Sequence, residues 1–297
     1  MEITKTAIVS MVGRPNVGKS TLTNKLVGRK VAIVSNKPQT TRTRITSLLN
    51  KDGCQYVFLD TPGLHKPRSR LGDYMVKVVE DTVTEVDVAA LIVEPIPNIG
   101  APEEKLISQI EEAGIPSILV INKTDTVKHE DLLAVIAAYA ARHEFDAVVP
   151  VSARTGKNLD ILMEEINKFA LEGPQLFPED MVSDQPERQM AAEIIREKML
   201  LLLDREVPHG VAVGIEKMET RESGTVSIYA TIYCEKASHK GIIIGKGGAM
   251  LKKIGELARR DLERDLGAKV YLDLWIKIKE DWRNNQYQMR NFGYQDE

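Results

Sequence analysis

Apolar runs of strand length alternate with segments of helical spacing over the first part of the chain. Strands are predicted near residues 6–12, 45–51, 55–60, 88–93, 116–122 and 146–151, and helices near 19–28, 71–85, 103–113, 129–142 and 158–171. This alternation is typical of an α/β fold with a doubly wound sheet. Ligands of such sheets bind at the carboxyl ends of the strands, so we expect the chemistry in the loops that follow them.

The pattern changes after residue 172. Residues 173–186 contain three prolines and several acids without a helical period, which predicts a linker. Beyond it, Val226, Ile228, Ala230, Ile232 and Cys234 alternate on one face of a half-buried antiparallel strand. Further elements are predicted as helices near 191–204, 238–244 and 249–266, and as strands near 211–218 and 272–278. We therefore predict an α/β domain over 1–172, a linker over 173–186 and an α+β domain over 187–297.

The loop after the first predicted strand has the spacing G-x-x-x-x-G-K-[ST], and it precedes a helix. Glycines let backbone N–H groups surround a β-phosphate, while the lysine reaches the β and γ oxygens and the hydroxyl ligates Mg²⁺. The alternative, an incidental glycine-rich turn, is disfavoured by the strand and helix on either side. The predicted phosphate-binding residues are Gly13, Arg14, Pro15, Asn16, Val17, Gly18, Lys19, Ser20 and Thr21.

The segment Asp60-Thr61-Pro62-Gly63 closes a second apolar strand. It places the Asp60 carboxylate where it can hold Mg²⁺ through water, and the Gly63 amide where it can reach a γ-phosphate. Thr41 lies in the loop between the first helix and the second strand, the place of a switch threonine that joins Mg²⁺ when the γ-phosphate is present. Thr40 is the alternative at this position.

Two further segments favour guanine over adenine. Asn122-Lys123-Thr124-Asp125 follows a buried run, and Asp125 is expected to accept bonds from the guanine N1–H and exocyclic amine, a donor pair that adenine lacks. Ser152-Ala153 follows the next strand and would give a backbone N–H to the guanine oxygen. Each string alone is weak, since such a tetrapeptide also occurs as an ordinary turn. Four in order, each after a predicted strand, predict a GTP or GDP site with Mg²⁺.

The residue after Gly63 is Leu64, where Ras-like enzymes have the glutamine that orients the attacking water. We therefore expect slow intrinsic hydrolysis, with Lys19, Thr41, Gly63 and Asn16 as the catalytic candidates. His65 is a candidate base, although a histidine in a switch loop is more often a surface or contact residue.

A G-x-x-G loop lies between two predicted helices of the second domain. Such a loop is the signature of a KH domain, which clamps about four single-stranded nucleotides. Basic residues surround it, although the whole chain has a formal net charge of −3. Arg259 and Arg260 are the residues that could belong to a merely solvated helix face. The predicted RNA-binding residues are Lys240, Gly245, Lys246, Gly247, Gly248, Lys252 and Lys253.

The composition supports a folded protein with two domains. The chain has 297 residues, of which 43% are apolar and 28% charged. Its two cysteines, Cys54 and Cys234, lie on separate predicted strands, which does not support a disulfide framework or a zinc site. We found no signal segment and no membrane-spanning run, and we expect reduced cysteines in the cytoplasm. The aromatic and basic residues after 281 are expected to dock on the domain rather than to stack bases.

Taken together, these motifs resemble the Era family of GTPases over essentially the whole chain. The segments that carry the resemblance are residues 13–20, Lys37-Pro38-Gln39-Thr40-Thr41-Arg42, Asp60-Thr61-Pro62-Gly63-Leu64 and the G-x-x-G loop. The resemblance implies a P-loop GTPase domain followed by a KH domain of type II topology. It also implies a protein that hydrolyses GTP to GDP and phosphate, binds 16S rRNA near its 3′ end and acts in assembly and maturation of the 30S ribosomal subunit.

The resemblance further implies cytoplasmic residence with some peripheral association with the cytoplasmic membrane, and we expect a monomer. Related GTPases with asparagine at the position of Asn16 bind K⁺, and we hypothesise that Asn16 helps to hold a K⁺ that raises turnover; a local turn hydrogen bond is its alternative role. Three other functions stay open: a constitutive RNA-binding protein with a structural nucleotide, a metabolic enzyme that uses GTP and a membrane-associated regulatory GTPase.

Overall fold

The computed structural model describes residues 3–294 and divides into two compact units. The first unit runs through Ala32 and also includes Thr41–Lys66 and Met75–Asp184. The second unit begins at Gln185 and also includes Ile33–Thr40 and Pro67–Tyr74. Two short segments of the N-terminal half therefore belong, by their contacts, to the C-terminal unit.

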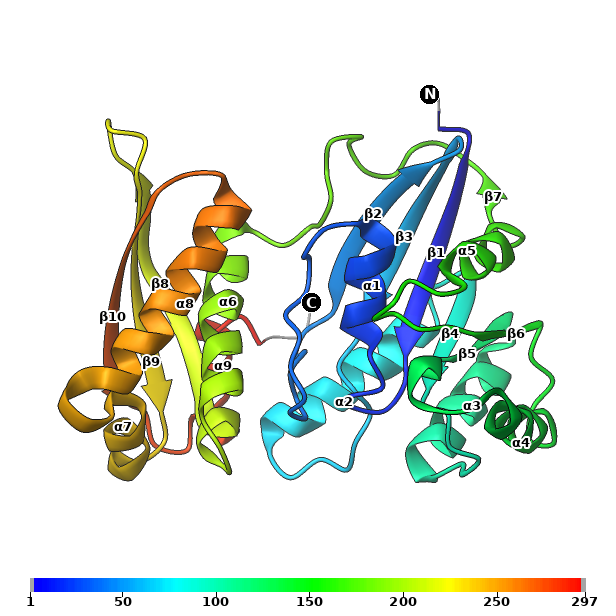
Figure 1. Ribbon diagram of the computed structural model, residues 1–297, viewed down its shortest axis with the longest axis horizontal. Coiled ribbons are helices and arrows are strands. Elements are labelled where there is room, and N and C mark those ends of the chain that lie inside the picture. Colours follow the sequence, from blue (N-terminus) through cyan, green and yellow to red (C-terminus); the bar gives the residue numbers. More distant parts are fainter. Residues whose placement is uncertain (1–2, 295–297) are drawn as a thin grey trace. The chain divides into compact units, whose positions relative to one another are not determined.

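A mixed sheet forms the centre of the first unit (Figure 1). Its main path has the order β2-β3-β1-β4-β5-β6, and every neighbouring pair is parallel except β2 and β3. The central strands are buried along their whole length, which explains their nearly continuous apolar sequence. The strands are β1 (Lys5–Val12), β2 (Ile45–Lys51), β3 (Cys54–Asp60), β4 (Val88–Val93), β5 (Ser117–Ile121) and β6 (Ala147–Pro150).

Helices cover both faces of this sheet, as the alternating sequence predicts. Apolar residues of α1 (Lys19–Val27) and α5 (Leu159–Asn167) share one core cluster with β1, β3 and β4. Residues of α2 (Arg70–Val83), α3 (Ala101–Ala113) and α4 (His129–Ala140) share the cluster on the opposite face. The prediction of a doubly wound α/β sheet is confirmed.

The segment predicted as a linker is largely held against the first unit. A short strand, β7 (Leu171–Glu172), pairs antiparallel with β1, and the amide of Leu48 donates to the carbonyl oxygen of Val182 at 2.9 Å. The buried side chain of Gln55 accepts from the amides of Leu176 and Phe177, both at 2.9 Å. The chain therefore leaves the first unit only after Asp184.

The second unit has a three-stranded sheet in the order β10-β9-β8. Strand β9 (Val226–Cys234) is antiparallel to β8 (Val211–Thr220) and parallel to β10 (Val270–Ile278). Figure 1 shows α6 (Glu187–Leu202) and α8 (Ala249–Leu266) along one face of the sheet, and both contact it. The short helix α7 (Ala237–Ile244) precedes α8, so the order of elements is that of a type II KH fold.

The alternating face of β9 is core, as predicted. Ile228, Ala230, Ile232 and Cys234 are completely buried, and they pack with apolar residues of α6 and α8. Both cysteines of the chain are free and buried.

The C-terminal aromatic residues dock on the second unit, as expected. Trp282 is 0% exposed, and its indole N–H donates to the carbonyl oxygen of Gly210 at 3.0 Å. The ring of Tyr294 stacks on that of Trp282 with centroids 5.9 Å apart. The ring of Phe292 contacts that of Trp282 in an edge-to-face arrangement. Tyr287 on α9 (Gln286–Asn291) is different, because it is 74% exposed.

Three consecutive charged residues of α6, Arg196, Glu197 and Lys198, are buried, which the amphipathic pattern did not predict. Buried charges need partners, and part of the partners comes from the segment Ile33–Thr40 of the same unit. The carboxylate of Glu197 accepts from the amide of Val34 at 3.0 Å, and the guanidinium of Arg196 donates to the carbonyl oxygen of Thr40. These bonds fix that segment to α6.

Candidate functional site

The loop between β1 and α1 wraps around the amino terminus of α1, and its main chain meets the loop after β5. Gly18 has φ +99°, in the region that favours glycine, and a Cβ at this position would clash with the side chain of Asn122. The Lys19 amino group donates to the carbonyl oxygens of Gly13 and Arg14 at 3.1 and 2.9 Å. Lys19 is therefore held across the loop whose amides would surround a phosphate.

Three oxygen-bearing side chains meet at the end of β3. The hydroxyl of Ser20 donates to Asp60 Oδ2 at 2.6 Å, and the hydroxyl of Thr41 lies 2.9 Å from that of Ser20. Asp60 is fully buried, and its second oxygen has no hydrogen-bond partner among residues 3–294. Two hydroxyls and a carboxylate with a free lone pair are suitable donors for Mg²⁺, which prefers oxygen ligands.

The two threonines of the loop before β2 are now distinguished by their contacts. Thr41 is 7% exposed, and its hydroxyl contacts that of Ser20, which in turn donates to Asp60. The hydroxyl of Thr40 instead donates to the carbonyl oxygen of Lys37 at 2.6 Å and lies 3.0 Å from the hydroxyl of Ser35. The geometry therefore favours Thr41 as the metal-binding threonine.

Burial shifts the two main charged groups of this site in opposite directions. Burial raises the pKa of Asp60 to about 6 and lowers the pKa of Lys19 to about 8, while their mutual attraction and the Ser20 bond to Asp60 partly offset this. A cation beside the carboxylate and a phosphate beside the ammonium would each favour the charged form. The electrostatics thus suit a metal and phosphate complex.

The loops after β5 and β6 are tied to the phosphate loop and to each other. The side-chain amide nitrogen of Asn122 donates to the carbonyl oxygen of Val17 at 2.8 Å. The side-chain oxygen of Asn122 accepts from the main-chain amide of Ala153 at 3.0 Å. The Ser152 hydroxyl donates to Asp125 Oδ1 at 2.6 Å. This bond, with the nearby Arg154, lowers the pKa of Asp125 and keeps the carboxylate ionised as an acceptor.

Lys123 and the residues after Asp60 complete the predicted constellation. The Lys123 amino group pairs with Glu94 at 2.5 Å, and the hydroxyl of Thr61 donates to the carbonyl oxygen of Met11 at 2.9 Å. The amide of Leu64 donates to the carbonyl oxygen of Gly13 at 3.2 Å, which brings Gly63 beside the phosphate loop. Glu94 is a residue of this site that the sequence did not single out.

The two residues after Gly63 differ in character. The side chain of Leu64 is buried and apolar, and a ring nitrogen of His65 lies 3.1 Å from the carbonyl oxygen of Gly63.

Asn16 has φ +66°, a left-handed conformation that asparagine tolerates in tight turns.

In the second unit, the G-x-x-G segment forms the connection between α7 and α8. Gly245 has φ +71°, and a Cβ there would meet the Met250 side chain at 2.7 Å, so this position requires glycine. Gly247 and Gly248 also have positive φ. Lys246, Lys252 and Lys253 are exposed around this turn, whereas Lys240 is half-buried. The loop therefore exposes its main chain and several cations on one side.

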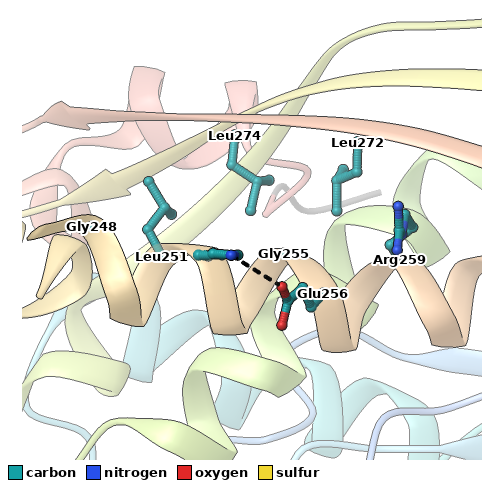
Figure 2. Close-up of a pocket in the computed structure, with 8 residues that line it drawn as sticks. Gly248, Leu251, Gly255, Glu256, Arg259, Leu272 and Leu274 are labelled. Atoms are coloured by element: carbon teal, nitrogen blue, oxygen red, sulfur yellow. Dashed lines mark ion pairs between the residues drawn. The ribbon is translucent and has the colours of Figure 1, made fainter.

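A cleft of about 480 Å³ begins at this loop and runs between α8 and β10. Figure 2 shows Leu272 and Leu274 projecting from β10 toward Leu251, Gly255 and Arg259 on α8. The absence of a side chain at Gly255 leaves the floor of the cleft open. Lys252 and Glu256 pair at 3.9 Å on its rim. An apolar floor beside a basic loop suits flat bases whose phosphates follow the loop.

Sequence reasoning missed this apolar wall. Leu272 and Leu274 lie on one face of β10, are half-buried, and contact both the core and the cleft. Arg259, which was left open as a solvated residue, lines the cleft. The available signal was Gly255, a glycine in the middle of a helix, which usually marks a close approach or a packing need.

The fold and the two sites define a P-loop GTPase domain joined to a KH domain. A family model described as a 50S ribosome-binding GTPase matches residues 8–123, and a KH domain model matches residues 206–283. GTPase Era of Ruminiclostridium cellulolyticum is 49% identical, with 98% of this chain and 97% of that protein covered. GTPase Era of Alkaliphilus metalliredigens is 50% identical over 98% of this chain and 99% of its own. The chain belongs to the Era family of GTPases.

Two solved structures are similar over the full length. A variant of Aquifex aeolicus Era bound to GDP and AlF4⁻ is 41% identical, with a TM-score of 0.94 over 98% of this chain and 99% of that chain. A structure of Era in complex with MgGDPNP and nucleotides 1506–1542 of 16S ribosomal RNA is 40% identical, with the same TM-score and coverage.

Proposed function

We propose that this GTPase is a nucleotide-dependent switch that binds 16S rRNA near its 3′ end and acts in assembly and maturation of the 30S ribosomal subunit. The observation that carries the proposal is the presence, in one chain, of the Ser20, Thr41 and Asp60 cluster and of a basic G-x-x-G loop that opens into an apolar cleft. It is further supported by the full-length similarity to an Era protein solved with MgGDPNP and 16S rRNA nucleotides 1506–1542.

In the nucleotide site, we assign the β- and γ-phosphates to the amides of residues 13–18 and to Lys19. Thr21, Thr61 and Pro62 complete the surroundings of the phosphates. The amide of Gly63 would reach the γ-phosphate, and this assignment rests on its position beside the phosphate loop. Asp125 would accept from the guanine N1–H and amine, the amide of Ala153 would donate to the guanine oxygen, and Asn122, Lys123 and Ser152 would hold this pocket together.

Mg²⁺ would be held by Ser20 and Thr41, with Asp60 acting through water, and it would neutralise charge on the phosphate oxygens. The free oxygen of buried Asp60 supports this assignment. Because the threonine is recruited only when a γ-phosphate is present, the segment that contains Thr41 would differ between the GTP and GDP states.

We also propose slow intrinsic hydrolysis that K⁺ stimulates. Leu64 offers no polar group to orient water, so positive charge near the phosphates would have to come from Lys19, Mg²⁺ and a further cation. Asn16 is our candidate K⁺ ligand, and its left-handed backbone places it in the phosphate loop turn. Turnover measured in K⁺ and in Na⁺ tests this; equal rates would refute it.

In the KH unit, the main chain of Gly245, Gly247 and Gly248 would approach the RNA backbone, with Lys246 and Lys252 at the phosphates. Lys240 and Lys253 would add to the surrounding positive potential. The cleft floor would take unstacked bases, which explains why it is apolar while its entrance is basic.

The test is the affinity for an RNA of 16S rRNA nucleotides 1506–1542, measured with GDPNP and then with GDP at one salt concentration. Allosteric coupling free energies typically change affinity about 5- to 150-fold, and we expect tighter binding with GDPNP in that range. A protein with charge-reversed Lys246→Glu is the control and should lose binding in both states. Tight RNA binding that is equal with GDPNP and GDP would favour a constitutive RNA-binding protein with a structural nucleotide.

We further propose a monomer located in the cytoplasm, with peripheral association with the cytoplasmic membrane in part. Within residues 3–294, none of the helices is long and apolar enough to cross a membrane. Sedimentation with anionic phospholipid vesicles tests the peripheral association, and light scattering tests the monomer.

A further inference from the structure

The outer face of the KH sheet, opposite α6 and α8, carries exposed aromatic side chains. Along β10, successive side chains point to opposite sides, so Tyr271 and Trp275 lie on the other face from Leu272 and Leu274. Trp275 is 64% exposed and Tyr271 is 46% exposed. Exposed apolar surface that is gathered on one face of a domain is a candidate for a binding surface.

These rings are held in place by their neighbours. The Tyr271 ring lies 6.0 Å from the ring of Tyr229 on β9, and the guanidinium of Arg221 lies 5.0 Å from its centroid. The Trp275 indole N–H donates to Asp273 at 3.1 Å, which restrains the orientation of the indole. These neighbours favour one orientation of each ring.

At the other end of the same sheet face, Phe292 of the C-terminal segment contacts the aromatic residue Tyr233. The centroids of these two rings are 4.7 Å apart, and Phe292 in turn meets buried Trp282. In contrast, Trp275 is 64% exposed and Tyr271 is 46% exposed, although the Arg221 guanidinium lies over the Tyr271 ring. The exposed part of the face is therefore not needed to complete the core.

The exposed rings adjoin the proposed RNA cleft. β10 is the edge strand of the sheet, and its inner side chains Leu272 and Leu274 form one wall of the cleft, as Figure 2 shows. Only the thickness of this strand separates the cleft from Trp275. A single strand that fills the cleft with about four nucleotides can therefore continue over β10 onto the outer face.

We propose that the outer face of the KH sheet, through Trp275 and Tyr271, is a second binding surface for single-stranded RNA that continues from the cleft. The inference rests on the proposed RNA binding of the cleft. Bases would stack on the two rings, as they do on the aromatic sheet faces of other RNA-binding modules. The cations Lys217, Arg221 and Lys277 are balanced by Glu216, Glu219 and Asp273 on this face, so stacking rather than charge provides the affinity.

The experiment compares two RNA lengths taken from 16S rRNA nucleotides 1506–1542: single strands of about five and about fifteen nucleotides from the 3′ end. For the longer RNA, Trp275→Ala should weaken binding about 5- to 150-fold, the range for one stacked base. The short RNA, which fills only the cleft, should bind the variant and the unaltered protein equally. Trp275→Phe, which keeps an aromatic ring, should restore most of the affinity for the longer RNA.

Two further readouts separate stacking from a change in structure. Because the loss is one of stacking, the dependence of affinity on salt should keep its slope in Trp275→Ala, whereas Lys246→Ala should flatten it for both RNAs. The chain has two tryptophans, and Trp282 is buried, so RNA that stacks on Trp275 should quench the emission of the unaltered protein but not that of Trp275→Phe.

The outcomes distinguish this proposal from the one it rests on. If the short RNA fails to bind the unaltered protein, the assignment of RNA to the cleft fails. If the short and long RNAs both bind, but Trp275→Ala binds the long RNA with unaltered affinity and no quenching occurs, the outer face is not an RNA surface. A protein partner would then be the occupant to seek for Trp275 and Tyr271.

Discussion

The side-chain amide of Asn122 donates a hydrogen bond to the main-chain carbonyl oxygen of Val17 at 2.8 Å. The same side chain accepts from the amide of Ala153 at 3.0 Å, so one buried residue links the phosphate loop with two loops of the base site. Asn122 therefore holds in place the groups that would contact GTP and GDP.

Replacing Asn122 with alanine should weaken GDP binding by about tenfold or more. The change removes two hydrogen bonds and leaves buried partners unsatisfied, which costs about 1–3 kcal/mol for each group. Titration with a fluorescent GDP analogue measures the effect. Asn98→Ala, at an exposed position in the same unit, is the matched control and should bind normally. A normal affinity for Asn122→Ala would show that the loops do not depend on this bridge.

The adjacent threonines should respond differently to substitution. Thr41→Ala should lower the affinity for GTP relative to GDP by about tenfold, because its hydroxyl belongs to the cluster with Ser20 and Asp60 and one Mg²⁺ ligand would be lost. Thr40→Ala should leave this ratio unchanged, since its hydroxyl faces Ser35 and Lys37. Competition of GTP analogue and GDP at fixed Mg²⁺ provides the measurement. The reverse ranking of the two variants would transfer the metal role to Thr40.

The acid limit of guanine binding should depend on Ser152. The hydrogen bond from Ser152 depresses the pKa of Asp125, and the charge of Arg154 adds to this effect. The carboxylate is therefore fully charged above its ordinary pKa, and it loses its charge only as the pH falls through the depressed value. Ser152→Ala should raise the pKa of Asp125, and its GDP affinity should fall at a higher pH than that of the unaltered protein. A comparison of both proteins from about pH 3 to 7, a range that extends below the ordinary Asp pKa of about 3.9, cancels the titration of GDP itself. Coinciding curves would argue against this role of Ser152.

The sequence predicted the main helices and strands of both units to within a few residues, because each one has a distinct physical pattern, but it did not predict β7 and α9. The buried strands β3, β4 and β5 are almost wholly apolar, and Val226 to Cys234 alternates without interruption. The nucleotide-site motifs were also recognisable, since a phosphate loop depends on main-chain geometry that only glycines at fixed spacing allow.

Long-range polar contacts were not predictable in the same way. The buried charges of α6 follow a helical pattern like any amphipathic helix. Some of their partners are local or lie on α8, but the partners in the segment Ile33–Thr40 lie more than a hundred residues earlier in the chain. Likewise, nothing in the proline-rich stretch near 173–186 indicates that Gln55 would hold it. The cleft wall of Leu272 and Leu274 has the same sequence signal as a core strand, and only the glycine at 255 distinguishes it.

The salt dependence of RNA binding should identify the loop cations individually. Each Lys that neutralises a phosphate of a single strand contributes about 0.7 to the slope of the logarithm of affinity against the logarithm of salt concentration. Lys246→Ala should therefore flatten this slope by about 0.7 and weaken binding to all sequences similarly, because phosphate contacts carry no base information. Lys269→Ala is the matched control: Lys269 is also exposed, but it follows the far end of α8, about 25 Å along the helix from the loop. If both variants changed the slope equally, the RNA would be attracted by the general field of the KH unit, and the G-x-x-G loop would not be its contact.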